Sequence, residues 1–183
     1  MINEQDIAQR CRRGDRRAQQ LLYETYADYL FGVCLRYVVD RTVAEDLLHE
    51  GFIKAFTQIS TFRYGGAGSL RSWLSSIMRN VAISHLRKRQ LLNEALSLDE
   101  YDIDIADEPN SVSCVPDDVL AQMIASLPVG YRTVFNMFVI DGCTHREIAK
   151  ALGIKERSSS SQLLRARKLL AQMITEWIKR NNR

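Results

Sequence analysis

The chain has 183 residues, of which 46% are hydrophobic and 26% charged, and its net charge is +3. This balance is typical of a soluble globular protein, and no apolar run approaches the ~18 residues of a membrane span. The first residues lack the apolar segment of a signal peptide, so we expect a cytoplasmic protein. The four cysteines are scattered without a CxxC pair, which predicts reduced thiols and no metal site.

Charge is strongly segregated along the chain. Residues 1–90 carry 14 Lys and Arg against 9 Asp and Glu, and residues 132–183 carry 11 basic residues against 4 acids. Residues 91–131 carry 9 acids and no basic residue. This acidic stretch has no sustained helical pattern and predicts a linker between two helical domains, although a structured acidic helix over part of it stays open. Only three prolines and long apolar patterns of period 3.6 predict an all-α protein.

The first basic block predicts four helices. Apolar residues recur at helical spacing over about 4–13, about 15–39, about 43–60 and from the serines at 69 and 72 to about residue 90. Asp40 offers a cap for the third helix. The glycines of "FRYGGAGS" require a loop before the fourth. On the third helix, Asp46, Glu50 and Ile53 share a partly polar face, because they are spaced by four and three residues.

The fourth helix carries side chains that suit unstacked bases. From Gly51 to Asn93 there are basic residues but no acid, which favours a polyanionic partner over a merely solvated helical face. Trp73, Asn80 and Arg87 fall on one face of this helix, together with Ser84. The aromatic plane can stack on a base, the amide can read a base edge and the cation can hold a phosphate. A Trp that is simply part of the core is the alternative.

The C-terminal block predicts a helix-turn-helix. Thr144 and Glu147 form a capping box at the start of a short helix, which ends at Gly153. In "ERSSSSQLLRARKLL" the serines are expected to form the cap, at Ser158, and the first turn of a second helix. The residues of this helix expected to face the major groove are Arg157, Ser161, Leu164, Arg165 and Lys168. Arg165 is the best candidate for a base contact, and an ordinary antiparallel helix pair is the alternative.

Three stretches together resemble the extracytoplasmic-function (ECF) group of the bacterial sigma-70 family: "AEDLLHEGFIKAF", "WLSSIMRNVAISHLRKR" and "LPVGYRTVFNMFVIDGCTHREIAKALGIKERSSSSQLLRARKLL". The resemblance implies region two at 1–92, an acidic linker at 93–116 and region four at 117–183. It implies a non-enzymatic subunit, without metal or cofactor, that is a monomer when free. Its partners would be core RNA polymerase, promoter DNA in duplex and single-stranded form, and an anti-sigma factor.

By position, the resemblance also implies roles for individual residues. Polymerase binding would fall to Asp46, Glu50 and Ile53. Recognition of the minus-ten element would fall to Tyr64, Ser69, Arg71, Trp73, Arg79, Asn80, Arg87 and Lys88. Recognition of the minus-thirty-five element would fall to Arg157, Ser158, Ser160, Ser161, Leu164, Arg165 and Lys168.

Four residues depart from the family pattern. His49 stands where Gln is common, Ser84 where Asp is common, Ser159 where a buried Val is common, and Ser160 where Lys or Arg is common. We expect Ser159 to weaken the core of the helix-turn-helix and Ser160 to lower the affinity for phosphate.

Two other classes of protein agree less well with the sequence. A conventional DNA-binding regulator would need a dimerisation element, and the sequence shows neither a heptad run nor a sensor domain. An enzyme such as a nuclease lacks support, since the sequence has no carboxylate cluster and no phosphate-cradling glycine loop.

Overall fold

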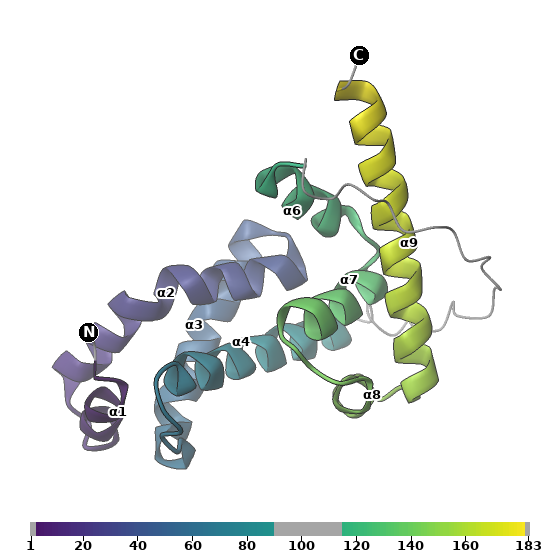
Figure 1. The fold of residues 1–183 in the computed structure, drawn as a ribbon. Helices are drawn as coiled ribbons and strands as arrows, with labels where there is room; N and C mark the ends of the chain where they lie inside the picture. Colours follow the sequence, from purple (N-terminus) through teal and green to yellow (C-terminus); the bar gives the residue numbers. More distant parts are fainter. Residues whose placement is uncertain (1–2, 90–114, 182–183) are drawn as a thin grey trace. The chain divides into compact units, whose positions relative to one another are not determined.

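The computed structural model describes residues 3–89 and 115–181, and all regular secondary structure in these ranges is helical (Figure 1). The chain divides into two compact units, Met1–His85 and Leu86–Arg183, each described here by itself. The expected all-α class is therefore confirmed. The expected linker at 93–116 lies outside the described residues except for its last two positions.

The first unit is built from four α-helices. They are α1 (Glu4–Arg12), α2 (Arg16–Val38), α3 (Arg41–Gln58), which runs into the short 3-10 helix η1 (Ile59–Thr61), and α4 (Ser69–Lys88). Side chains that accept backbone N–H groups begin the first three: Asn3, Asp15 and Asp40. The Asp40 cap is therefore confirmed. The glycine-rich segment, 62–68, is a loop as expected.

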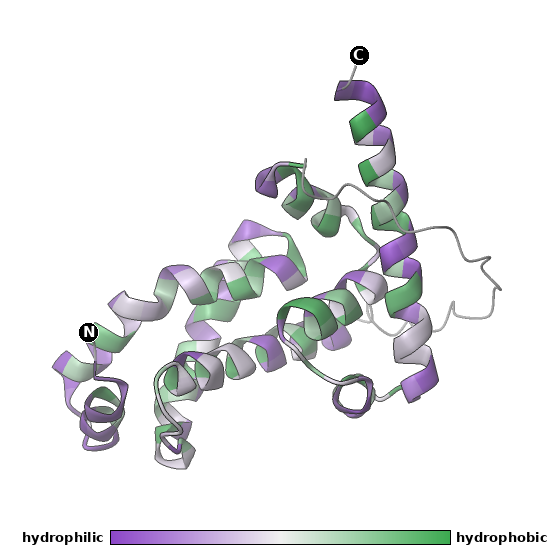
Figure 2. Cartoon of the chain, in the orientation of Figure 1, coloured by the Kyte–Doolittle hydropathy of each residue, from purple (hydrophilic) through white to green (hydrophobic). Residues whose placement is uncertain are grey.

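The core of the first unit lies where α2, α3 and α4 present apolar faces. The side chains of Leu22, Leu30 and Leu74 have no exposed surface. Helix α3 packs on α4 at Gly51, where a Cβ atom would lie only 2.1 Å from Sδ of Met78. A side chain at this position therefore requires Met78 to move, and the constraint comes from packing rather than from backbone conformation. In Figure 2, α1 is coloured mostly as hydrophilic, because it buries only one narrow face against this core.

The second unit is arranged around one long helix. Its elements are α6 (Asp117–Ser126), α7 (Val129–Phe135), the π-helical turn η3 (Asn136–Ile140), α8 (His145–Leu152) and α9 (Glu156–Asn181). Helices α6, α7 and α8 all pack against α9. Leu127, Ala166 and Leu170 form a core cluster between them. The side chain of Arg132 is buried and donates to the carbonyls of Ala125, at 3.0 Å, and Leu127, at 2.8 Å, which fixes the junction of α6 and α7.

Helices α8 and α9 form the expected helix-turn-helix. Thr144 and Glu147 make both bonds of the capping box, and Gly153 ends α8 in the left-handed region, with a φ of 68°. The expected cap at Ser158 is wrong, because α9 begins at Glu156. The N–H of Ser159 already donates to the carbonyl of Lys155, so the first turn begins three residues earlier than expected. The serines lie inside the helix.

Ser159 is buried, as expected, but its hydroxyl does not lack a partner. Its side chain has no exposed surface, and its Oγ lies 2.9 Å from Nδ1 of His145 on α8. The ring of His145 in turn stacks on Phe138, with centroids 4.5 Å apart. A hydrogen bond thus joins α8 and α9 at a position where an apolar contact was expected.

Within 3–89 and 115–181, no helix is both long enough and apolar enough to cross a bilayer. The same residues contain no group of three side chains able to hold a metal ion. Cys11, Cys34 and Cys143 form no disulfide, and burial raises the pKa of the Cys34 thiol to about 12.

Candidate nucleic-acid and polymerase interfaces

The first four turns of α9 present a row of short and long side chains, exposed or partly exposed to solvent. Arg157 and Ser160 are exposed, and Leu164 keeps 48% of its surface. Ser158, Ser161 and Lys168 are partly buried. An apolar side chain with this exposure, beside hydroxyls and cations at the N-terminal end of a helix, suits a groove where thymine methyl groups and phosphates lie together.

Arg165 does not belong to this exposed row. Only 8% of its surface is accessible, so the expectation that it is exposed is wrong. It follows the fully buried Gln162 by three positions and precedes the fully buried Ala166 by one. On a helix with 3.6 residues per turn this places Arg165 at the edge of the inward-facing stripe.

The glycine loop presents Tyr64 to solvent with 46% of its surface exposed. Gly66 and Gly68 have φ values of 108° and 83°, which only glycine adopts at low cost. Ser69 is the first residue of α4, and its hydroxyl accepts the N–H of Gly65 at 3.2 Å. This bond closes the loop on the helix that follows it.

The outward side of α4 carries the residues that the sequence associates with DNA. Trp73 is partly buried, because its ring packs on the buried Phe62, with centroids 5.5 Å apart. Asn80 is exposed. The guanidinium of Arg71 lies 3.7 Å from the ring centre of Tyr29 on α2. Of the remaining cations, Lys88 is exposed, and Arg79 and Arg87 are partly buried.

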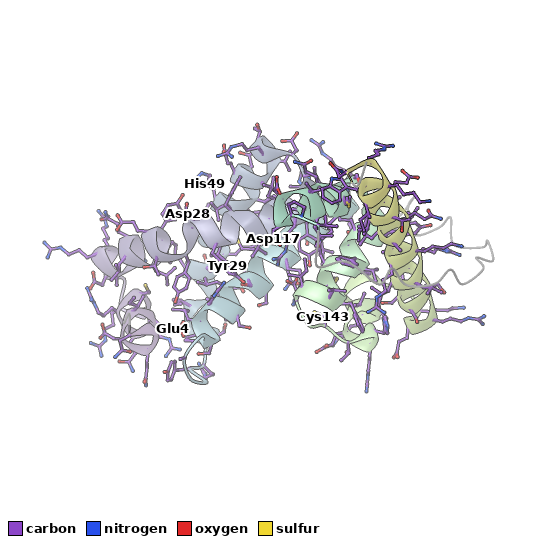
Figure 3. The ribbon with its side chains drawn as sticks, turned by 45° about the horizontal axis from the view of Figure 1, so that its top comes forward. Glu4, Asp28, Tyr29, His49, Asp117 and Cys143 are labelled. Carbon is purple, nitrogen blue, oxygen red and sulfur yellow. The ribbon has the colours of Figure 1, made fainter. Side chains whose placement is uncertain are left out.

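The outward side of α3 has a different chemistry. Asp46, Glu50 and Ile53 are all exposed, and Ile53 keeps 67% of its surface. Glu50 makes an ion pair with Lys54 on the same helix, at 2.6 Å. His49, also exposed, stacks parallel to Tyr23 on α2, with centroids 6.4 Å apart (Figure 3). An apolar side chain within an acidic rim is typical of a protein-binding surface rather than a DNA-binding one.

A cleft of about 240 Å³ lies beside the glycine loop, and the sequence does not predict it. Its lining residues are Gln5, Ala8, Gln9, Arg12, Phe62, Arg63 and Tyr64. Those from α1 lie at helical spacings of four and three, a pattern that could have indicated a polar face. Nothing in the sequence alone places that face beside a loop about fifty residues away.

Comparison with known proteins matches each unit to a family model. The model of sigma-70 region 2 matches residues 22–91, and that of sigma-70 region 4 matches residues 117–170.

Similar curated proteins carry the same family description. The chain is 32% identical over 160 residues to the ECF RNA polymerase sigma factor SigX of Bacillus subtilis, covering 82% of this chain and 80% of that one. It is 29% identical over 178 residues to the RNA polymerase sigma-H factor of Pseudomonas aeruginosa, covering 91% of each.

Two solved structures share the fold. The sigma factor RpoE of Bartonella quintana, solved with the anti-sigma factor NepR, has a TM-score of 0.54 at 22% identity and covers 85% of this chain and 96% of its own. CnrH, solved with the cytosolic domain of CnrY, has a TM-score of 0.52 at 19% identity and covers 94% of this chain and 97% of its own. With both units matched in the expected order, the chain belongs to the ECF group of the sigma-70 family and is a sigma factor that acts with RNA polymerase to initiate transcription at promoters.

Proposed function

We propose that three exposed surfaces of this sigma factor each bind a different partner or promoter element. The outward side of α3 binds the clamp of core RNA polymerase, the glycine loop with the outward side of α4 opens and reads the minus-ten element, and the first turns of α9 read the minus-thirty-five element. The carrying observation is that each surface has exposed residues among those predicted for its task, such as Ile53, Asn80 and Leu164, on helices whose opposite sides form the core.

For the minus-thirty-five element, exposure decides among the candidates on α9. Ser160, Ser161 and Leu164 reach toward the bases, with Leu164 suited to a thymine methyl group. Arg157 and Lys168 hold phosphates. Arg165 is a weaker candidate for a base contact than the sequence indicated, because its buried position leaves little of the guanidinium for DNA.

For the minus-ten element, Tyr64 and Asn80 contact the unstacked strand directly, since both are exposed. Trp73 offers only part of its ring, because Phe62 covers the rest. Stacking on an aromatic ring contributes roughly 1–3 kcal/mol per base, enough to help hold a base out of a duplex when several contacts combine. Arg71 and Lys88 supply charge along the same strand.

For polymerase, Ile53 is the anchor and Asp46 and Glu50 form its rim. Interfaces obtain most of their affinity from a few desolvated apolar or aromatic side chains, and rim charges chiefly set orientation and the rate of encounter.

The protein is proposed to work as a monomer without enzymatic activity, metal or cofactor, in the cytoplasm. An anti-sigma factor is proposed as a regulator, since RpoE of Bartonella quintana was solved with one.

The test is run-off transcription of genomic fragments by core polymerase with and without the purified chain. Promoter-specific transcripts that depend on both components are expected. Binding to duplex DNA that core polymerase does not alter would instead indicate a conventional regulator. Exchange of Asp46 and Glu50 for Asn and Gln, and of Leu164 for Ala, separates loss of polymerase binding from loss of upstream recognition.

A further inference from the structure

Helix α1 contacts both ends of the glycine loop, although it lies before the segment that the region 2 model matches, 22–91. Two of its side chains make these contacts: Arg12 at the start of the loop and Glu4 at its end. They are separated by eight residues, or about 12 Å along a helix. One short helix therefore spans the base of the loop.

Arg12 holds the chain where it leaves η1. Its Nε donates to the carbonyl of Ile59 at 3.1 Å, and its Nη2 donates to the carbonyl of Phe62. The planar fork of a guanidinium can bind two carbonyls at once in a fixed orientation, which an ammonium group cannot do. Since both bonds are made to backbone, they fix the course of the chain into the loop.

Glu4 holds the chain where it enters α4. Its Oε2 accepts the N–H of Leu70 at 3.2 Å, and its Oε1 accepts the hydroxyl of Tyr26 at 2.9 Å. The first N–H groups of a helix lack partners within the helix, and a carboxylate at this end is favoured by the helix dipole. Tyr26 is buried, and burial together with this bond raises its pKa to about 12. Figure 3 labels Glu4 on α1.

The position of α1 is itself fixed. Ile7, Ala8 and Cys11 are buried along one side. At its C-terminal end, Nε of Arg10 donates to Oδ2 of Asp15, the cap of α2, at 2.9 Å. A helix anchored along its length and at its end can transmit a fixed geometry to the loop.

We propose that Arg12 and Glu4 are positioning residues that set the geometry of the glycine loop and thereby the base selectivity of the protein at the minus-ten element. This inference rests on the proposed role of the loop in reading that element. It predicts that selectivity depends on a helix whose hydrogen bonds to the two ends of the loop are made to backbone groups.

The experiment uses the full chain with core polymerase and a pool of linear templates randomised at both promoter elements. Transcribed templates are sequenced, and the preference at each position is compared among variants. Arg12→Ala and Glu4→Gln are expected to reduce the preferences at the minus-ten positions by about tenfold, the factor that loss of one strong hydrogen bond produces. Preferences at the minus-thirty-five positions and affinity for core polymerase should stay as in the original protein.

Three comparisons exclude simpler explanations. Arg13→Ala removes the same charge from an exposed neighbour and is expected to leave selectivity intact. Glu4→Gln removes a negative charge, so a purely electrostatic effect on DNA would strengthen binding and leave selectivity unchanged. Arg12→Lys keeps the charge without the fork, and should restore only part of the selectivity.

Failure of the inference is distinguishable from failure of the proposed function. If Tyr64→Ala flattens the minus-ten preferences while Arg12→Ala and Glu4→Gln do not, the positioning role is refuted and the reading role of the loop stands. If Tyr64→Ala also changes nothing, the loop does not read the element. Loss of polymerase binding and of both sets of preferences together in Arg12→Ala would show a purely structural role and overturn the inference.

Discussion

The hydrogen bond between His145 and Ser159 is expected to stabilise the second unit by about 1 kcal/mol. Ser159→Ala removes the hydroxyl that lies 2.9 Å from Nδ1 of His145. His145 is only partly buried, so its ring can turn to water after the substitution. The expected cost is therefore that of one net hydrogen bond, about 0.5–1.5 kcal/mol, rather than that of a buried polar group left without a partner.

His145→Ala should cost more, because it also removes the stacking of the ring on Phe138, at 4.5 Å between centroids. Such pairs contribute about 0.5–1.5 kcal/mol, which brings the expected total to about 1–3 kcal/mol. Because the two residues share one bond, the double variant should be more stable than the sum of the single losses predicts. The expected coupling energy is about 1 kcal/mol.

The assay is urea unfolding followed by tryptophan fluorescence. The chain has two tryptophans, and Trp177 lies on α9. In a Trp73→Phe background, fluorescence therefore reports on the second unit alone, which avoids treating a two-unit protein as a single transition. A coupling energy below about 0.3 kcal/mol, the error of such cycles, would refute the reasoning.

Three further substitutions test the first unit. Ile53→Glu should weaken binding to core polymerase at least about tenfold in a fluorescence titration without lowering thermal stability, because the side chain is 67% exposed; an unchanged affinity would exclude it from the interface. Gly51→Ala should destabilise the unit by about 1–3 kcal/mol in thermal unfolding, because the new Cβ would lie 2.1 Å from Sδ of Met78; full stability would mean that Met78 moves aside freely. Trp73→Ala should impair promoter opening, measured by permanganate reactivity of unpaired thymines, while polymerase binding stays near normal; loss of polymerase binding would make the ring structural, through its contact with Phe62.

Much of the fold is predictable from the sequence because its signals are local. The cap at Asp40, the capping box of Thr144 and Glu147, and the left-handed turn at Gly153 each depend on neighbours within a few residues. Buried stripes follow from helical spacing, and Leu163, Ala166 and Leu170, spaced by three and four residues, are all buried.

The wrong or absent predictions concern features that depend on the packing of neighbouring elements. Periodicity gives the angle of Arg165 around α9, but not how far neighbouring elements cover the flank on which it lies. The start of α9 was placed too late, because the carbonyl of Lys155 closes the first turn before any serine is needed as a cap. The contacts of α1 with the loop join Arg12 to Phe62 and Glu4 to Leu70. The two pairs are 50 and 66 residues apart in the sequence, and a local sequence pattern does not predict contacts over such separations.

The packing of α3 on α4 explains how one small unit can hold polymerase and DNA without conflict. The two helices meet at Gly51 and Met78. Ile53 and Asn80 each follow the contact residue of their own helix by two positions, about 200° around the helix axis. Both therefore point away from the contact, on opposite sides of the helix pair.

Charge reinforces this separation. The outward side of α3 carries exposed acids, among them Asp46 and Glu50, whereas the sequence from Gly51 to Asn93 contains none. A polyanion is repelled from the first surface and attracted to the second, and the screening length of about 8–10 Å keeps the two effects local. The directions in which the two surfaces face depend on the packing of α3 on α4 at Gly51. A larger side chain there should therefore weaken both polymerase binding and binding of the unpaired DNA strand, although it touches neither partner.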